Sequence, residues 1–317
     1  MKTFSSVRVI GYLSLLFLNF SCVVQKNDTL LSIAKESYCV PPKSTTDFRY
    51  GITTNSDSVL KANISLKPKF SESSILIMNA LRINDEIHEI VNKTNKKSLE
   101  SMVRLNTLKQ QIDNRVWMAN SEIDALSAEL DCEGERIDQI ANFVDNSNSS
   151  KTTKLTVASI VIGAASSIAT VLISNESLNN GVAIGAGVLG ASLGFATLNP
   201  KGKKVEINTN RNLLRNVWLN QNRHEISPFV WYMLTEPQFS NSGKTTLLQN
   251  TKERWLTYQF DENLTKANKS VNFSEGGIYI ADDLHARSQM INQFQSVVRS
   301  IKQNLNLFIA ELNNAFD

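Results

Sequence analysis

"LNTLKQQIDNRVWMANSEIDALSAELDCEGERIDQIANFV" is the sequence of residues 105–144, and its apolar residues recur in steps of three and four. Such spacing places them on one face of an α-helix. No proline or glycine occurs between Pro68 and Gly134, and "SESS" at 71–74 is a favourable helix start. A helical segment is therefore predicted over 71–147. Its apolar stripe consists of Leu105, Leu108, Ile112, Val116, Ala119, Ile123, Leu126, Leu130, Ile137, Ile140 and Val144.

A polar stretch, "NKTNKKS" at 92–98, interrupts this stripe. One continuous helix from Glu72 to Phe143 would be about 108 Å long, at about 1.5 Å per residue. Two helices joined near the polar stretch are an equally good interpretation. The number of helices in 71–147 therefore stays open at this point.

The C-terminal part of the chain repeats the pattern with greater regularity. Its apolar residues alternate steps of three and four throughout: Ile291, Phe294, Val298, Ile301, Leu305, Phe308 and Leu312. This face requires a partner, and the helix ending near Val144 is the natural one. Region 205–317 is therefore predicted to be helical and to pack on 71–147, with shorter helices over 209–222 and 244–269. The expected fold is mainly α, an elongated antiparallel helical bundle or coiled coil.

Between these regions, residues 155–198 contain only one ionisable side chain, that of Glu176. As helices, Leu155–Ser174 and Gly181–Leu198 would be about 30 and about 27 Å long. These lengths match the roughly 30 Å of hydrocarbon in a bilayer. Because the segments are apolar or small on every side, burial on every side is expected. A central apolar hairpin in a membrane is the favoured interpretation, and the buried centre of a soluble helical domain is the alternative.

Small residues recur at four-residue intervals in this hairpin: Ser159, Gly163, Ser167, Ala183, Gly187, Gly190, Ala191 and Gly194. Such rows allow helix backbones to approach closely in lipid. The pattern is similar to the glycine-zipper hairpins of bacterial envelope lipoproteins. That resemblance implies self-association as a homo-oligomer in or on a membrane. The layout, a long helix, an apolar hairpin and returning helices, also resembles alpha-helical pore-forming toxins, which implies a secreted protein that inserts later.

Lysines flank the hairpin on both sides, as Lys151, Lys154, Lys201, Lys203 and Lys204. Both ends of the hairpin are therefore expected on one side of the membrane, close to lipid headgroups. If the chain is exported, this side is external to the cytoplasm, against the usual positive-inside bias. Insertion after export, into an outer or a foreign membrane, avoids that conflict.

Residues 1–21 have the character of a signal peptide, with Lys2 and Arg8 before the apolar run "VIGYLSLLFLNF". The following Cys22 resembles the acylated cysteine of the bacterial lipoprotein lipobox, although Asn19 stands where that family favours an aliphatic residue. The resemblance implies lipidation of Cys22 and an outer-membrane lipoprotein of the cell envelope. Ordinary cleavage and an uncleaved anchor are the alternatives. Residues 22–70 are predicted to be a tether followed by irregular structure.

Lipidation of Cys22 would leave Cys39 and Cys132 as the other two cysteines of the chain. In an oxidising compartment they are free to form one disulfide. Two unpaired buried thiols are the alternative.

Sequence motifs indicate no enzyme, cofactor or metal site. "SNSGKTTLL" at 240–248 resembles part of a phosphate-binding loop, but Gln238 stands where its first glycine is needed. The three histidines have no ligand spacing, and the acidic residues of 131–139 are assigned to a solvated helix face. The net charge of +3 is scattered, so no nucleic-acid partner is expected. The expected partners are membrane lipid, further copies of the chain and a possible envelope protein.

Overall fold

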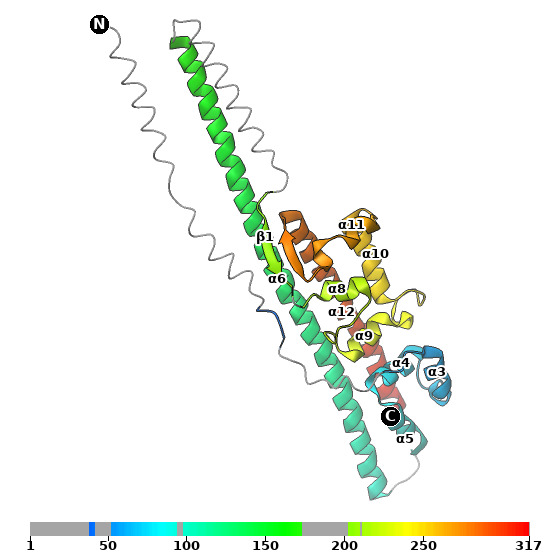
Figure 1. Ribbon diagram of the computed structural model, residues 1–317. Coiled ribbons are helices and arrows are strands. Elements are labelled where there is room, and N and C mark those ends of the chain that lie inside the picture. The colour runs from blue at the N-terminus through cyan, green and yellow to red at the C-terminus, as the bar shows by residue number, and fades with distance from the viewer. Residues whose placement is uncertain (1–37, 42–51, 94–97, 173–201, 210, 317) are drawn as a thin grey trace, which may run out of the picture. The chain divides into compact units, whose positions relative to one another are not determined.

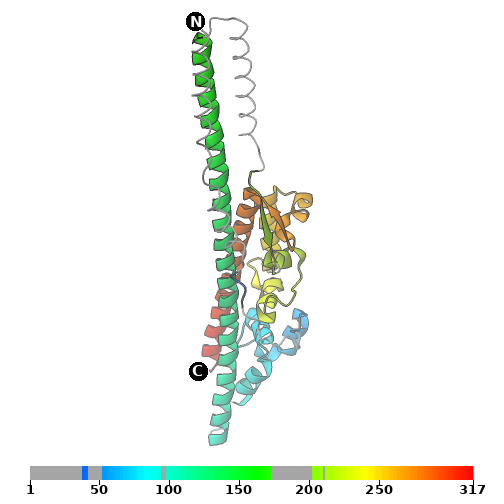
Figure 2. The same cartoon turned by 60° about the vertical axis from the view of Figure 1, so that its left-hand side comes forward.

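The computed structural model describes residues 38–41, 52–93, 98–172, 202–209 and 211–316, with 155–172 as backbone only. Ser37–Asp317 forms one compact unit. Its two longest helices, α6 (Leu99–Leu172) and α12 (Ala281–Phe316), lie side by side (Figures 1 and 2). The mainly α fold with an antiparallel helical bundle is thereby confirmed. Residues 173–198 of the predicted apolar hairpin lie outside the described residues.

The predicted stripes form the interface between α6 and α12. All seven stripe residues of α12 are buried, and those of α6 are buried from Leu108 to Val144 except for the half-buried Val116. The two helices run in opposite directions, since Gln295 donates to the Ser127 carbonyl at 3.2 Å and Lys302 pairs with Asp124 at 2.6 Å. The spacing of apolar residues therefore identified the correct partner faces.

The α6 stripe skips a turn between Leu130 and Ile137 because α12 approaches closely there. Ser288 Oγ donates to the Gly134 carbonyl at 3.4 Å. A Cβ on Gly134 would lie 2.7 Å from Asn292 Oδ1. A side chain at this position would therefore require the Asn292 side chain on α12 to move.

The N-terminal part of the unit contains four short helices: α3 (Ser56–Ala62), η2 (Ile64–Leu66), α4 (Glu72–Leu81) and α5 (Asn84–Lys93). Ser71 caps α4, which agrees with the predicted helix start. Residues 56–66 are helical, although irregular structure was predicted through residue 70. Asn55 caps α3, and the side chains of Val59 and Leu66 are buried. These helices are too short for a periodicity of apolar residues to appear in the sequence.

The helical segment predicted over 71–147 is divided twice. Arg82 adopts the left-handed conformation (φ 58°, ψ 49°) and ends α4, while Ile83 after it is fully buried. Helix α5 ends at Lys93 and α6 begins at Leu99, on either side of the polar stretch, in agreement with the interpretation of two helices joined there; the division at Arg82 was not predicted. From Leu99 the helix continues to Leu172, so the predicted segments 71–147 and 155–198 are not separated by a helix end.

The C-terminal region places shorter elements beside α12: β1 (Val205–Asn208), α8 (Leu213–Leu219), α9 (Pro228–Thr235), η3 (Pro237–Phe239), α10 (Leu247–Phe260), α11 (Leu264–Asn268), η4 (Val271–Phe273) and β2 (Gly276–Tyr279). The antiparallel pair of β1 and β2, with Val205 opposite Tyr279, was not predicted. The helix predicted over 244–269 is divided at Asp261 and Glu262, which both have positive φ.

Aromatic side chains form much of the core of this region. The ring of Trp218 stacks on Phe273 with centroids 4.5 Å apart. Trp255 is fully buried and Tyr232 is buried, whereas Trp231 is half-buried. The region therefore has its own packed core on the side of α12.

Candidate membrane-contacting segment

Helix α6 continues beyond the part that α12 covers (Figure 1). Near the start of α12, His285 Nε2 lies 2.7 Å from Asp145 Oδ2 on α6. From Asn148 to Leu172 the helix runs on for about 36 Å, at about 1.5 Å per residue. Its last part, residues 155–172, contains no charged residue. A helix that belongs to the packed unit thus leads without a break into the apolar sequence.

The chain returns to α6 at a contact that we call the neck, formed by Asn148, Gly202 and Lys203. Asn148 Oδ1 accepts a hydrogen bond from the backbone N–H of Lys203 at 2.7 Å. Lys203 Nζ lies 4.5 Å from the centroid of the Phe143 ring. Gly202 has a φ of 50°, and a Cβ on it would clash with the Asn148 side chain. The residues that come directly before and after 149–201 in the chain are therefore in contact with each other.

Of the five predicted headgroup contacts, four lie at or near the neck. Lys151, Lys154 and Lys204 are exposed, and Lys203 is half-buried against Phe143. Lys201 lies outside the described residues. The lysines that precede and follow the apolar segment in sequence thus meet at the same end of the packed unit.

The residues predicted to pack the hairpin fall in two groups. Ser159, Gly163 and Ser167 lie one turn apart along α6. The others lie outside the described residues, as does the predicted lipidation site Cys22: Ala183, Gly187, Gly190, Ala191 and Gly194. Among residues whose side chains are described, no helix is long and apolar enough to cross a membrane.

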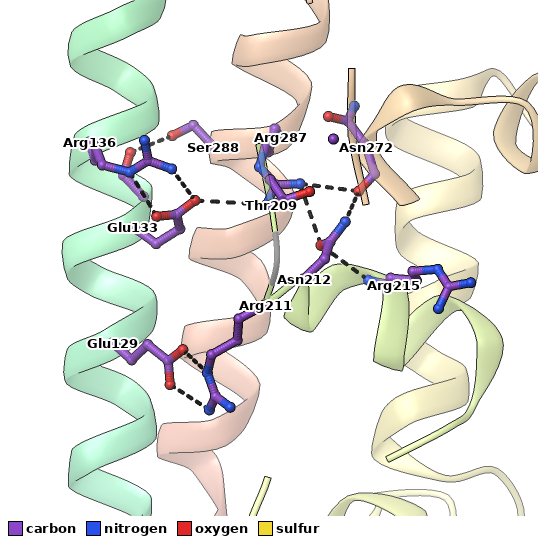
Figure 3. Close-up of polar contacts among 12 residues, drawn as sticks. Glu129, Glu133, Arg136, Thr209, Arg211, Asn212, Arg215, Asn272, Arg287 and Ser288 are labelled. Carbon is purple, nitrogen blue, oxygen red and sulfur yellow. Dashed lines mark hydrogen bonds and ion pairs between the residues drawn. The ribbon is translucent and has the colours of Figure 1, made fainter. Parts of the chain in front are cut away.

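Below the neck, two buried arginines share one carboxylate (Figure 3). The side chains of Arg136 and Arg287 are 1% and 2% exposed. Arg136 donates to both oxygens of Glu133, at 2.9 and 2.8 Å, and Arg287 Nη2 lies 3.8 Å from Glu133 Oε1. Arg287 also donates to the Asn272 carbonyl at 3.1 Å. Because buried charges need partners, the Glu133 carboxylate that both guanidiniums share is central to this cluster.

A second, half-buried ion pair holds the segment after β1 against α6. Arg211 donates to both oxygens of Glu129, at 2.5 and 2.9 Å. Burial raises the pKa of Glu129 above its ordinary value, although the neighbouring Arg211 acts in the opposite direction. Asn212 donates to the carbonyls of Asn272 and Ser274, which connects this segment to η4 (Figure 3).

The partial burial of Glu133 corrects one prediction made from the sequence. Glu133 belongs to the 131–139 stretch that was placed on a solvated face, but its side chain is 18% exposed and lies between two helices. In the sequence, the interruption of the apolar stripe after Leu130 was the feature that could have indicated this role of Glu133. A gap in such a stripe can mark polar residues that have partners in the core.

Cys39 and Cys132 form a disulfide, with their Cα atoms 5.6 Å apart. Cys39 is buried, whereas its neighbours Tyr38 and Val40 are exposed. The disulfide therefore attaches the stretch 38–41 to the middle of α6, and the pairing considered from the cysteine count is present.

Other candidate sites have local structural roles. In the 240–248 loop, Ser242 Oγ accepts from the N–H groups of Lys244 and Thr245, and Thr246 caps α10. His88 forms a hydrogen bond with Asn63. Within the described ranges, no group of three or more His, Cys, Asp or Glu side chains could hold a metal ion.

Comparison with protein-family models, curated proteins and solved structures finds no match to this chain. Function is therefore inferred from the chain's own residues. The features that bear on it are the extension of α6, the neck and the lysines beside it.

Proposed function

We propose that the chain is a non-enzymatic, exported lipoprotein of the cell envelope, anchored through Cys22. Its apolar segment 155–198 inserts in or associates at a lipid membrane and self-assembles there. The neck carries this proposal, because it brings Asn148 into contact with Lys203, on either side of a sequence whose residues 155–198 contain one ionisable side chain.

Two physical arguments support a membrane role for this segment. In lipid, every backbone polar group must find a partner within the protein, which a continuing helix such as α6 provides. In addition, Lys151, Lys154 and Lys204 are exposed beside the neck, where they can contact lipid headgroups.

A single acidic substitution tests insertion directly. Ile162→Asp places a charge near the middle of 155–172, where a bilayer-centre carboxylate costs about 2.5–3.5 kcal/mol. We expect the Cys22→Ser chain, which cannot be lipidated, to float with lipid vesicles. Adding Ile162→Asp should weaken this binding by roughly 100-fold.

Leu264→Asp is the matched control for that test, since Leu264 is 56% exposed on α11 and belongs to the packed unit. It should bind vesicles like the parent. Equal binding by the Ile162→Asp and Leu264→Asp chains would contradict insertion. Release of a trapped dye from the same vesicles would favour the alternative function, that of a secreted pore-forming protein.

The lysines at the neck should matter only on anionic lipid. Each basic residue near such a surface contributes about 1 kcal/mol. Replacing Lys151, Lys154 and Lys204 by glutamine is therefore expected to weaken binding to anionic vesicles by about 100-fold, and to leave binding to neutral vesicles unchanged. Vesicle flotation with each kind of lipid, in low and in high salt, measures the loss of binding on anionic and on neutral vesicles. An equal loss on both kinds of lipid would contradict headgroup contact.

A further inference from the structure

The Cys39–Cys132 disulfide attaches the N-terminal part of the chain to the middle of α6. The two Cα atoms lie 5.6 Å apart. On either side of Cys39, Tyr38 and Val40 are 62% and 56% exposed, so the disulfide holds this stretch against the helix while its neighbours face solvent. The disulfide therefore determines the point on the packed unit from which the chain leads back to Cys22.

The distance from this point to the proposed membrane surface follows from helix geometry. Leu155, where the apolar sequence begins, lies 23 residues after Cys132 on α6, which is about 35 Å at about 1.5 Å per residue. Transmembrane helices tilt by up to about 40°, and at that tilt Cys132 still lies about 26 Å above the surface. The 17 residues from Cys22 to Cys39, which we call the tether, can span at most about 58 Å. Cys22 can therefore reach the membrane that 155–198 enters.

The N-terminal helices α3, α4 and α5 lie beside the other end of α6 (Figure 1). Just before α4, Lys69 Nζ donates to the Ala315 carbonyl at the end of α12, at 3.3 Å. Next to Ala315, the Phe316 ring lies under Lys109 Nζ at 5.3 Å. Lys109 is 46 residues before Leu155 on α6, a separation of about 69 Å. The disulfide thus moves the attachment point of the tether from this far end toward the membrane.

We infer that the disulfide confines an acylated Cys22 and the apolar segment 155–198 to one membrane. This inference rests on the proposed function. A tether raises the effective concentration of a second binding element most strongly when its length matches the distance to be spanned. The disulfide provides such a match, because it starts a tether of at most about 58 Å at about 35 Å from the surface. The packed unit then stays close to the membrane that holds the lipid.

A chain that lacks residues 23–37 tests this inference and leaves every described residue in place. In this deletion chain, Cys22 is followed directly by Tyr38 and Cys39. The tether and the disulfide together then reach about 13 Å, half of the 26 Å or so that the most tilted helix requires. The matched control carries a Gly/Ser linker of equal length in place of 23–37, so it differs from the parent in tether sequence and not in tether length.

Protection of the apolar segment from protease is the measurement. Each purified chain, beginning at Cys22, is coupled through that thiol to a maleimide lipid in vesicles too dilute to aggregate. Cys22 is the only free thiol while the disulfide is formed. Digestion with proteinase K and mass spectrometry then quantify the protected fragment from 155–198. The parent and the control should give equal amounts, and the deletion chain at least about tenfold less.

A second pair of chains tests whether the disulfide causes the loss. The Gly/Ser linker is moved from 23–37 to a position between Thr45 and Thr46, after Cys39 in the chain. With the disulfide formed, this relocated chain should lose protection as the deletion chain does. With Cys39→Ser and Cys132→Ser, its tether extends to the N-terminal helices, and protection should return to the parent's amount. Circular dichroism checks that the serine variant is folded, and the deletion and its control test the inference without it.

Equal protection in the deletion chain and its control would overturn the inference and leave membrane insertion intact. A folded serine variant of the relocated chain that stays unprotected would overturn it as well. If the parent shows no protected fragment, the proposed function itself fails, and the inference that rests on it fails too. The parent and the deletion chain therefore distinguish the two failures.

Discussion

A chain in which a linker of about four residues replaces 149–201 is expected to keep its fold and to lose binding to lipid vesicles. The neck is the reason for the first expectation. Asn148 Oδ1 and the Lys203 N–H are 2.7 Å apart, so a short linker can join the two stretches without moving either.

Two measurements check this deletion, both in a Cys22→Ser background. Denaturant unfolding should give a free energy within about 1 kcal/mol of the parent, since no described core contact is removed. Vesicle flotation should fall to background. An unfolded deletion variant would show that 149–201 belong to a soluble core, and a folded variant that still floats would contradict the membrane role of the segment.

Glu133→Ala is expected to destabilise the protein by about 3–5 kcal/mol, because removing one partner of a buried pair leaves uncompensated charge. Here one carboxylate is removed from between two guanidiniums that are 1% and 2% exposed. Equilibrium unfolding in urea, followed by circular dichroism, measures the loss.

Glu135→Ala is the control for this substitution, since Glu135 is exposed on the same helix. Its effect should stay within about 0.5 kcal/mol. Combining Glu133→Ala with Arg287→Met should cost less than the sum of the two single changes, because one unpaired charge disappears. Strict additivity, or equal losses for Glu133→Ala and Glu135→Ala, would show that the cluster does not act as a unit.

Local sequence patterns predicted the parts of the fold that depend on periodicity. The stripes of α6 and α12 could be identified because a helix with one apolar face must bury it, and each stripe has the other as its partner. The start of α4 followed from Ser71, whose side chain accepts from the Ser74 N–H. These features depend on neighbouring residues, and the sequence displays them directly.

Other features depend on residues that are far apart in the chain. The end of α4 at Arg82 has no local signal, because arginine rarely adopts a positive φ, and burial of Ile83 accompanies it. The strand pair brings Val205 opposite Tyr279. Neither could be derived from periodicity, since the energy that stabilises it comes from tertiary contacts.

The sequence by itself determined that this chain has two long amphipathic helices with an apolar, nearly uncharged segment between them. Only the tertiary structure decided that the residues on either side of this segment meet at one neck, and that two buried arginines share the Glu133 carboxylate. The physical reason is that apolar periodicity reports which face is buried. A hydrogen bond or ion pair between distant residues depends on where the packed helices bring them.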